Sequence, residues 1–183
     1  PEMVNRDSRL YEAHPDWVLG SEDRPRCVGR HQLVLDFSKD EVIDYIGGLM
    51  EDIIGRGHLS YIKWDMNRSV TEAWSSGRDA ACQGTVMHRQ ILGVYRLYER
   101  LIRKFPHVLF ESCASGGARF DPGMLYYAPQ VWTSDDTDGV ERIRIQYGTS
   151  YVYPLSSMGS HVSAAPNHQT HRRVPMETRA VCA

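Results

Sequence analysis

Two aspartates, Asp65 and Asp135, have the clearest chemical potential in this sequence. Asp65 ends the stretch Tyr61–Asp65, and Asp135 follows the short apolar segment Val131–Thr133. Two carboxyl groups held at the ends of two strands are the minimum equipment for cleaving a glycosidic bond. The sequence therefore predicts glycoside hydrolysis as the leading chemistry.

The neighbours of Asp65 favour a nucleophile. Lys63 lies two positions earlier, so both side chains point to the same face of a regular strand. A nearby cation keeps a carboxylate ionised, as a nucleophile must be. An interior ion pair that only stabilises the fold would show the same spacing, and the spacing alone does not separate the two.

Asp135 belongs to an acidic run with Asp136 and Asp138. Repulsion between adjacent carboxylates favours protonation of one of them, which suits a general acid. The competing interpretation is an Asp-rich turn or a helix N-cap before Val140. Taken by itself, the pattern favours that second interpretation. The run lacks the alternating oxygens and closing Glu of a calcium loop.

Other side chains could contact a sugar or a metal. Arg30 and the indoles of Trp17, Trp64 and Trp132 could bind a hydroxylated ring, although a single Trp is more often a core residue. Cys113 follows a strand but has no evident base beside it. The histidines match no metal-ligand spacing, so they predict no metal site.

Composition excludes several classes of protein. The 183 residues carry a formal net charge of −2, with no basic run, so neither nucleic acid nor an anionic membrane is expected as a partner. No apolar run approaches the ~20 residues of a membrane span. The four cysteines are scattered, which favours reduced thiols and a cytoplasmic location.

Periodicity predicts alternating strands and helices. Ser38 and Glu41 form a capping box, which predicts a helix whose apolar face runs from Val42 to Ile54 and ends at Gly55 and Gly57. The remaining predicted elements are strands at 33–36 and 61–64, a helix at 87–105, strands at 108–112 and 131–133, and a segment at 140–153 that begins as a helix.

This alternation implies parallel strands, in either an open sheet or a barrel. Polar residues follow successive predicted strands, and a barrel gathers such strand ends around one cavity. These residues are Asp36, Asp65, Glu111 or Cys113, and Asp135. We therefore predict an α/β fold, a partial (β/α)8 TIM barrel over residues 1–183, because the length is short of the ~250 typical of a whole barrel.

Three blocks make the sequence recognisable. It resembles glycoside hydrolase family 36, the microbial alpha-galactosidases, over essentially its whole length. The blocks are Lys63–Arg68, Glu111–Asp121 and Trp132–Asp138, with further matches at 14–17, 29–37 and 159–169.

The resemblance implies retaining hydrolysis of terminal alpha-1,6-linked galactose in melibiose, raffinose or stachyose, without metal or cofactor. It makes Asp65 the nucleophile and Asp135 the acid/base. It also makes Lys63, Asn67, Cys113 and Arg30 contacts of the galactose, to which the aromatic residues Trp17 and Trp64 are added. A homo-oligomer is expected for a full-length member.

Full members also have an N-terminal β-sandwich, early barrel strands and a C-terminal β domain, which this sequence lacks. We therefore expect the middle-to-late strands only, and a 183-residue chain that is poorly stable and inactive alone. Rival functions are an alpha-N-acetylgalactosaminidase, a galactosyl-transferring relative, and a non-catalytic carbohydrate-binding barrel piece.

Overall fold

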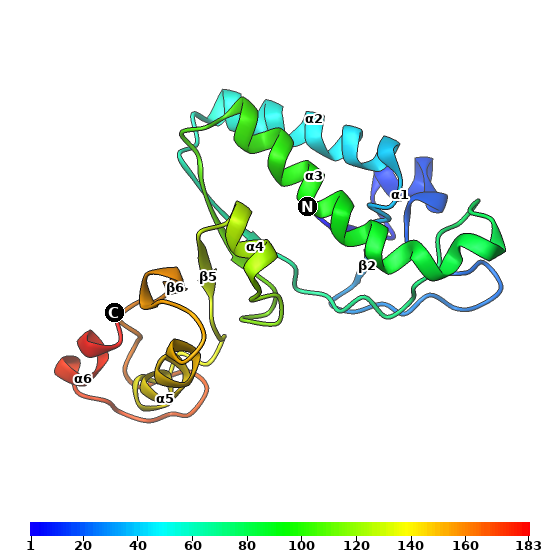
Figure 1. The fold of residues 1–183 in the computed structure, drawn as a ribbon. Coiled ribbons are helices and arrows are strands. Elements are labelled where there is room, and N and C mark those ends of the chain that lie inside the picture. Colours follow the sequence, from blue (N-terminus) through cyan, green and yellow to red (C-terminus); the bar gives the residue numbers. More distant parts are fainter. The chain divides into compact units, whose positions relative to one another are not determined.

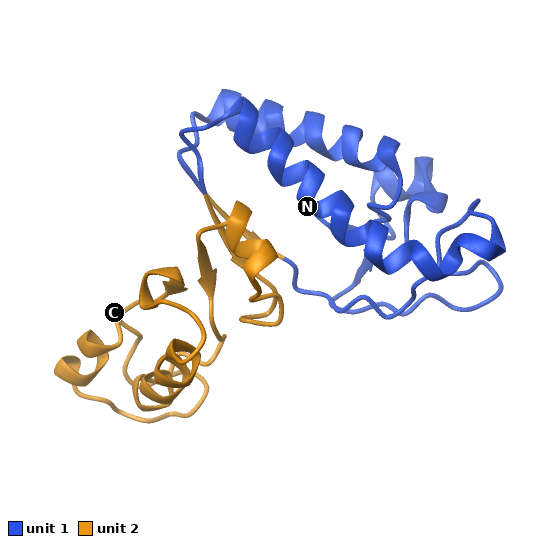
Figure 2. Cartoon of the chain, in the orientation of Figure 1, with its two compact units in different colours: residues 1–61, 66–109 blue, residues 62–65, 110–183 orange.

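The computed structural model describes residues 1–183, which form two compact units (Figure 2). Unit 1 comprises residues 1–61 and 66–109, and unit 2 comprises residues 62–65 and 110–183. A two-stranded sheet belongs to the first unit, and a four-stranded sheet is centred on the second. The chain passes between the units at three points, so neither unit is one continuous segment.

Two long helices dominate unit 1 and run side by side (Figure 1). They are α2 (Asp40–Gly57) and α3 (Val86–Lys104). The smaller elements are β1 (Met3–Asn5), α1 (Arg9–Ala13) and β2 (Gln32–Val34). The prediction of a helix at 87–105 is confirmed to within one residue at each end.

Glycines allow α2 and α3 to pack against their neighbours. A Cβ on Gly47 would lie 2.8 Å from the guanidinium of Arg100, which reaches across from α3. Arg100 donates to Glu51 at 2.6 Å and to Asp44 at 3.1 Å, so the helices share ion pairs as well as apolar contacts. A Cβ on Gly93 would lie 1.9 Å from a backbone oxygen, so only glycine fits there.

The predicted start of α2 was wrong. Its N-cap is Lys39, without a side-chain hydrogen bond, whereas the Ser38 hydroxyl donates to Asp36 Oδ1 at 2.6 Å. Asp36 is fully buried and also accepts the Ser38 amide, so it stabilises a turn. Its strand, β2, pairs antiparallel with β1, so Asp36 does not follow a strand of the parallel sheet as predicted.

Unit 2 is built on parallel strands, as the alternation predicted. The strand order is β3-β4-β5-β6, and β5 is parallel to both β4 and β6. The strands are β3 (Tyr61–Asp65), β4 (Leu109–Cys113), β5 (Gln130–Trp132) and β6 (Met158–Gly159). The helices are α4 (Pro122–Tyr127), α5 (Gly139–Ser150) and α6 (Met176–Val181).

The predicted strands at 61–64, 108–112 and 131–133 are confirmed as β3, β4 and β5 with small shifts. The ambiguous segment at 140–153 is helical through Ser150. The two residues of β6 were not predicted as a strand. The predicted apolar face of α2 was partly wrong, because Leu49 and Ile53 are 46% and 58% exposed. None of the helices has the length and apolar character needed to cross a bilayer.

Candidate functional site

Polar and aromatic side chains gather where the strands of unit 2 end. Each of the four strands contributes at its carboxyl end or in the residues just after it. The residues are Lys63 and Asp65 on β3, Glu111 and Cys113 on β4, Trp132 and Asp135 at β5, and His161 after β6. The ends of adjacent parallel strands meet at one edge of a sheet, which is the usual ligand-binding edge of such folds.

Asp65 is held by the loop that follows β4. The Ser115 amide donates to Asp65 Oδ1 at 3.4 Å, and the Cys113 thiol lies within hydrogen-bonding reach of the same carboxylate. Burial, together with the negative charge of Asp65, raises the pKa of Cys113 to about 11. The sulfur therefore stays protonated near neutral pH and can donate to Asp65.

Asp135 is exposed, and its carboxylate accepts the indole N–H of Trp132 at 3.1 Å. The Trp132 ring is in turn fixed by charged and aromatic neighbours. Lys63 Nζ lies 4.2 Å and the Arg142 guanidinium 4.6 Å from its centroid, and the His161 ring stacks on it at 5.0 Å. Such contacts fix the ring plane and, with it, the direction of the N–H.

His161 is neutral over most of the physiological range in this setting. Partial burial, followed by the positive charges of Arg142 and Lys63, lowers the pKa of His161 below its usual value of 6.5. A neutral imidazole can stack on Trp132 without adding a third cation beside the indole.

The loop at 113–117 contacts the backbone of Asp135 as well as the side chain of Asp65. A Cβ on Gly116 would lie 2.9 Å from the Asp135 amide nitrogen, and one on Gly117 would lie 2.5 Å from the Thr133 carbonyl oxygen. Gly116 also has φ of +85°, a conformation that favours glycine. The two glycines therefore let one loop touch both aspartate-bearing segments.

Lys63 forms its ion pair with Glu111 rather than the one expected with Asp65. The distance from Lys63 Nζ to Glu111 Oε1 is 3.3 Å, and the Glu111 side chain is only 8% exposed. Glu111 lies opposite Gly159, where an added Cβ would come within 3.1 Å of Glu111 Oε1. Lys63 therefore links β3 to β4 and to the Trp132 ring.

Trp64 was wrongly predicted to be a sugar contact. Only 1% of the residue is exposed, and its ring packs near Phe110, with 6.5 Å between centroids. Alternation along β3 explains this, because Trp64 points to the face opposite to that of Lys63 and Asp65. Cys113 is also 1% exposed, so its established contact is with Asp65.

The remaining predicted sugar contacts belong to unit 1. Trp17 stacks on His14 with 3.8 Å between ring centroids, and Asn67 is half-buried. Arg30 is exposed in a two-residue hairpin turn with His31, closed by two hydrogen bonds between Gly29 and Gln32. The role of these three unit 1 residues in binding a sugar stays a prediction.

The hairpin turn has an unusual backbone. Arg30 and His31 have φ of 53° and 61°, in the left-handed region that Asn-Gly normally occupies in such turns. The Arg68 guanidinium stabilises the turn by donating to the carbonyl oxygens of Gln32 and Cys27. The buried Arg68 side chain therefore holds the backbone on both sides of the turn.

A separate cavity in unit 1 contains none of the predicted site residues. It has a volume of about 600 Å³ and is lined by residues 20–21, 23–26 and 71–74, with Trp74 at its wall. No group of three or more His, Cys, Asp or Glu side chains is arranged to hold a metal ion.

Sequence reasoning missed the residues that orient the aspartates. Arg142 belongs to α5 and is buried, yet it donates to the carbonyl oxygens of Ser134 and Gly159. Nothing in the sequence indicated that His161 stacks on Trp132. The adjacent glycines Gly116 and Gly117, just after a strand, were the one signal in the sequence that two loops come into close contact here.

Comparison with known proteins identifies the family of the chain. The melibiase family model matches residues 1–183. The chain belongs to the melibiase family. Among curated proteins, this melibiase segment is 54% identical over 179 residues to alpha-galactosidase AgaA of Geobacillus stearothermophilus, covering 98% of this chain and 25% of AgaA. It is 53% identical over 180 residues to alpha-galactosidase C of Emericella nidulans, covering 98% of this chain and 23% of that protein.

Solved structures give the same result. The alpha-galactosidase of Lactobacillus brevis matches all of this chain with a TM-score of 0.97 and 56% identity, over 25% of its own length. An AgaA variant in complex with raffinose matches with a TM-score of 0.97 and 53% identity, over 26% of its length. The melibiase segment therefore spans about a quarter of the length of the relatives that it matches.

Proposed function

We propose that the protein carrying these residues is a retaining alpha-galactosidase that removes terminal alpha-1,6-linked galactose from melibiose, raffinose and stachyose. The family match and the names of the relatives support this activity. AgaA variants have been solved with raffinose and with stachyose, which supports galactosides as substrates. The curated relatives compared above are both alpha-galactosidases, so no observation favours the rival activities.

The observation that carries the mechanism is the loop at 113–117, which contacts the Asp65 carboxylate and the backbone of Asp135. A second observation comes from AgaA. The aspartates substituted in its stachyose and raffinose complexes are seventy positions apart, the same separation as between Asp65 and Asp135.

In this mechanism Asp65 attacks the anomeric carbon, while protonated Asp135 donates its proton to the leaving oxygen. Water then attacks the galactosyl–enzyme intermediate and gives its proton to Asp135, so galactose leaves with its original anomeric configuration. The Ser115 amide and the Cys113 thiol orient Asp65, and the Trp132 indole N–H orients Asp135. Retention requires a separation of about 5–5.5 Å between the two carboxyl groups in the working enzyme.

The wider setting is also part of the proposal. The parallel strands of unit 2 would be successive strands of a (β/α)8 barrel. The exposed free thiols of Cys27 and Cys82 fit a reducing compartment such as the cytoplasm. Sedimentation of the protein expressed from its complete natural reading frame would test whether it is a homo-oligomer.

The first prediction separates the two aspartates by product stereochemistry. In the protein from the complete reading frame, Asp65→Gly and Asp135→Asn should each lower raffinose hydrolysis by at least about 100-fold. With an activated galactoside and added azide, Asp135→Asn should form alpha-galactosyl azide, because azide replaces water in the second step. Asp65→Gly should form beta-galactosyl azide, because azide then attacks the substrate directly. NMR of the products distinguishes the two anomers.

Glu177→Gln is the matched control, since it removes one exposed carboxylate of unit 2. It should retain activity. Full raffinose hydrolysis by Asp135→Asn, or azide products of the opposite anomeric configuration, would contradict the assigned roles.

A further inference from the structure

The loop that carries Asp135 is held along its whole length. The Ser134 carbonyl oxygen accepts from Arg142 Nη1 at 3.0 Å, and the Ser134 hydroxyl oxygen accepts the Asp136 amide at 3.0 Å. Asp136 Oδ1 in turn accepts the Asp138 amide at 3.0 Å. Asp135 is the exposed member of this loop, so its carboxylate projects from a backbone that is fixed on both sides.

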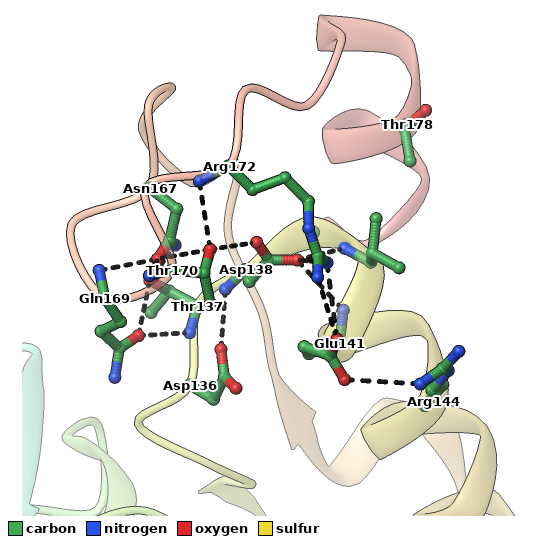
Figure 3. Close-up of polar contacts among 12 residues, drawn as sticks. Asp136, Thr137, Asp138, Glu141, Arg144, Asn167, Gln169, Thr170, Arg172 and Thr178 are labelled. Atoms are coloured by element: carbon green, nitrogen blue, oxygen red, sulfur yellow. Dashed lines mark hydrogen bonds and ion pairs between the residues drawn. The ribbon is translucent and has the colours of Figure 1, made fainter.

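Asp138 anchors the end of the loop. It is fully buried and is the N-cap of α5, where its Oδ1 accepts the amides of Val140 at 2.9 Å and Glu141 at 3.3 Å. Thr170 Oγ1 donates to its Oδ2 at 2.5 Å, and Arg172 Nη1 donates to its Oδ1 at 2.7 Å (Figure 3).

These donors keep Asp138 ionised although it is buried. Burial alone raises the pKa of a carboxyl group, but the hydrogen bonds from Thr170 and the two amides, with the charge of Arg172, outweigh it and lower the pKa of Asp138. An N-cap needs at most two acceptor contacts with its own helix. The additional bonds to Thr170 and Arg172 come from another segment and tie that segment to the loop.

A second pair of contacts joins the same two segments. Asn167 Nδ2 donates to Thr137 Oγ1 at 3.0 Å, and the Thr137 amide donates to Gln169 Oε1 at 3.0 Å (Figure 3). Asn167 is 2% exposed, and its Oδ1 accepts the amides of Gln169 and Thr170. The segment at 167–172 is therefore a compact turn that forms hydrogen bonds with both Thr137 and Asp138.

We propose that Asp138, Asn167, Thr170 and Arg172 form a clamp that positions Asp135 for proton transfer to the leaving group. This inference rests on the proposed function and assigns the four residues a positioning role in it. None of them needs to touch substrate. The clamp fixes the loop backbone at Thr137 and Asp138, and the Trp132 N–H fixes the Asp135 carboxylate from the other side.

The clamp should affect one chemical step more than the other. Proton donation depends on a placement of the acid within a fraction of an ångström, and a 1 Å error can cost about 100-fold in rate. In a galactoside with a very good leaving group, such as 2,4-dinitrophenolate, that group departs without receiving a proton. Raffinose has a poor leaving group and needs the acid.

The second prediction uses this difference, in the protein from the complete reading frame. Thr170→Val removes the hydroxyl donor at nearly constant shape. It should lower kcat for raffinose by about 10- to 100-fold, with little change in KM. The kcat/KM for 2,4-dinitrophenyl galactoside should fall by less than about threefold, because kcat/KM reports galactosylation, which does not need the acid for this leaving group. Thr170→Ser should restore raffinose hydrolysis.

Thr178→Val is the matched control. Thr178 lies on α6, outside the contacts of the clamp, and its backbone oxygen accepts from the Cys182 thiol (Figure 3). It should leave both activities unchanged. If Thr170→Val does not fold, Arg172→Met decides, since the Arg172 side chain is 41% exposed. It should show the same split between substrates.

The outcomes separate the two proposals. Equal loss of kcat/KM on both substrates, or no loss on either, would overturn the clamp while leaving the alpha-galactosidase assignment intact. A wild-type protein that hydrolyses neither galactoside would overturn the proposed function and the clamp with it.

Discussion

At the ends of β3 and β4, the thiol of Cys113 lies within hydrogen-bonding reach of the Asp65 carboxylate, and that carboxylate affects the pKa of the thiol. Burial and, after it, the hydrogen bond and negative charge of Asp65 together raise the pKa of the thiol to about 11. Thiolate is the form that reacts with alkylating agents. Cys113 should therefore be inert under conditions in which the exposed thiols of Cys27 and Cys82 react.

The third prediction concerns this inertness. At pH 8, iodoacetamide should label Cys27 and Cys82 at least about 100-fold faster than Cys113, measured by peptide mass spectrometry. Asp65→Asn should accelerate labelling of Cys113, because it removes a negative charge that opposes the thiolate. Fast labelling of Cys113 in the unsubstituted protein would mean that the thiol is neither buried nor coupled to Asp65.

At this scale the sequence predicted residue types better than their partners. It selected Asp65, Lys63 and Cys113, which the structure does bring together at neighbouring strand ends. It could not assign Lys63 to Glu111, because the choice of an ion-pair partner depends on strand register. The acidic run shows the same limit: Asp138 is the N-cap that the competing interpretation expected, whereas Asp135 is the exposed carboxylate.

Among the elements, α3 shows most clearly how packing restricts a helix. Gln90 reaches the backbone around Phe37, donating to the Leu35 carbonyl oxygen at 3.0 Å and accepting the Phe37 amide at 2.7 Å. Gly93, one turn later on the same face, leaves room for the Phe37 carbonyl group. The hydrogen bonds of Gln90 and the absence of a side chain at Gly93 thus let α3 pack closely against residues 35–37, which precede α2.

The fourth prediction follows from that contact. Gly93→Ala should destabilise the protein by about 1–3 kcal/mol, because the new Cβ would overlap the Phe37 carbonyl oxygen, an overpacking cost that exceeds the helix-propensity gain. Gly48→Ala is the control, since nothing lies within 4 Å of its added Cβ, and it should stabilise by about 0.5–1 kcal/mol. Urea denaturation measures both. Stabilisation by both variants would refute the close approach of α3.

Most of the elements that the sequence predicted have a clear apolar pattern, whereas the three-residue strand β5 was predicted from its apolar residues and the acidic run after it. Helix α3 and strands β3 and β4 are long enough for an apolar pattern to appear. Strand β6 has two residues, and its pairing with β5 is the only property that makes it a strand. No pattern within a sequence can reveal a partner at such a distance along the chain.

Over the whole molecule, one apolar area stands out. Tyr147, Tyr151, Val152 and Leu155 lie on the last turns of α5 and the residues just after it, and they are 64% to 75% exposed. The two tyrosines contact each other edge to face. A cluster of this kind is a common site of association between proteins.

The fifth prediction is that the 183-residue chain self-associates through this area. Its sedimentation coefficient should rise with concentration in the micromolar range, as exposed apolar side chains meet. The double variant Tyr151→Ser and Leu155→Ser should reduce that rise, whereas Met176→Ser, at a comparably exposed site on α6, should not. Concentration-independent sedimentation of the unsubstituted chain would refute the prediction.

The hairpin turn at Arg30 and His31 has a consequence for anyone who engineers this protein. Left-handed backbone at two ordinary residues costs on the order of 1 kcal/mol each, and Asn-Gly would avoid most of that cost. A search for thermostable variants would therefore favour replacement of these two residues early. These replacements should be avoided. Folding alone does not explain why an arginine and a histidine occupy so unfavourable a turn, so their side chains are expected to serve function.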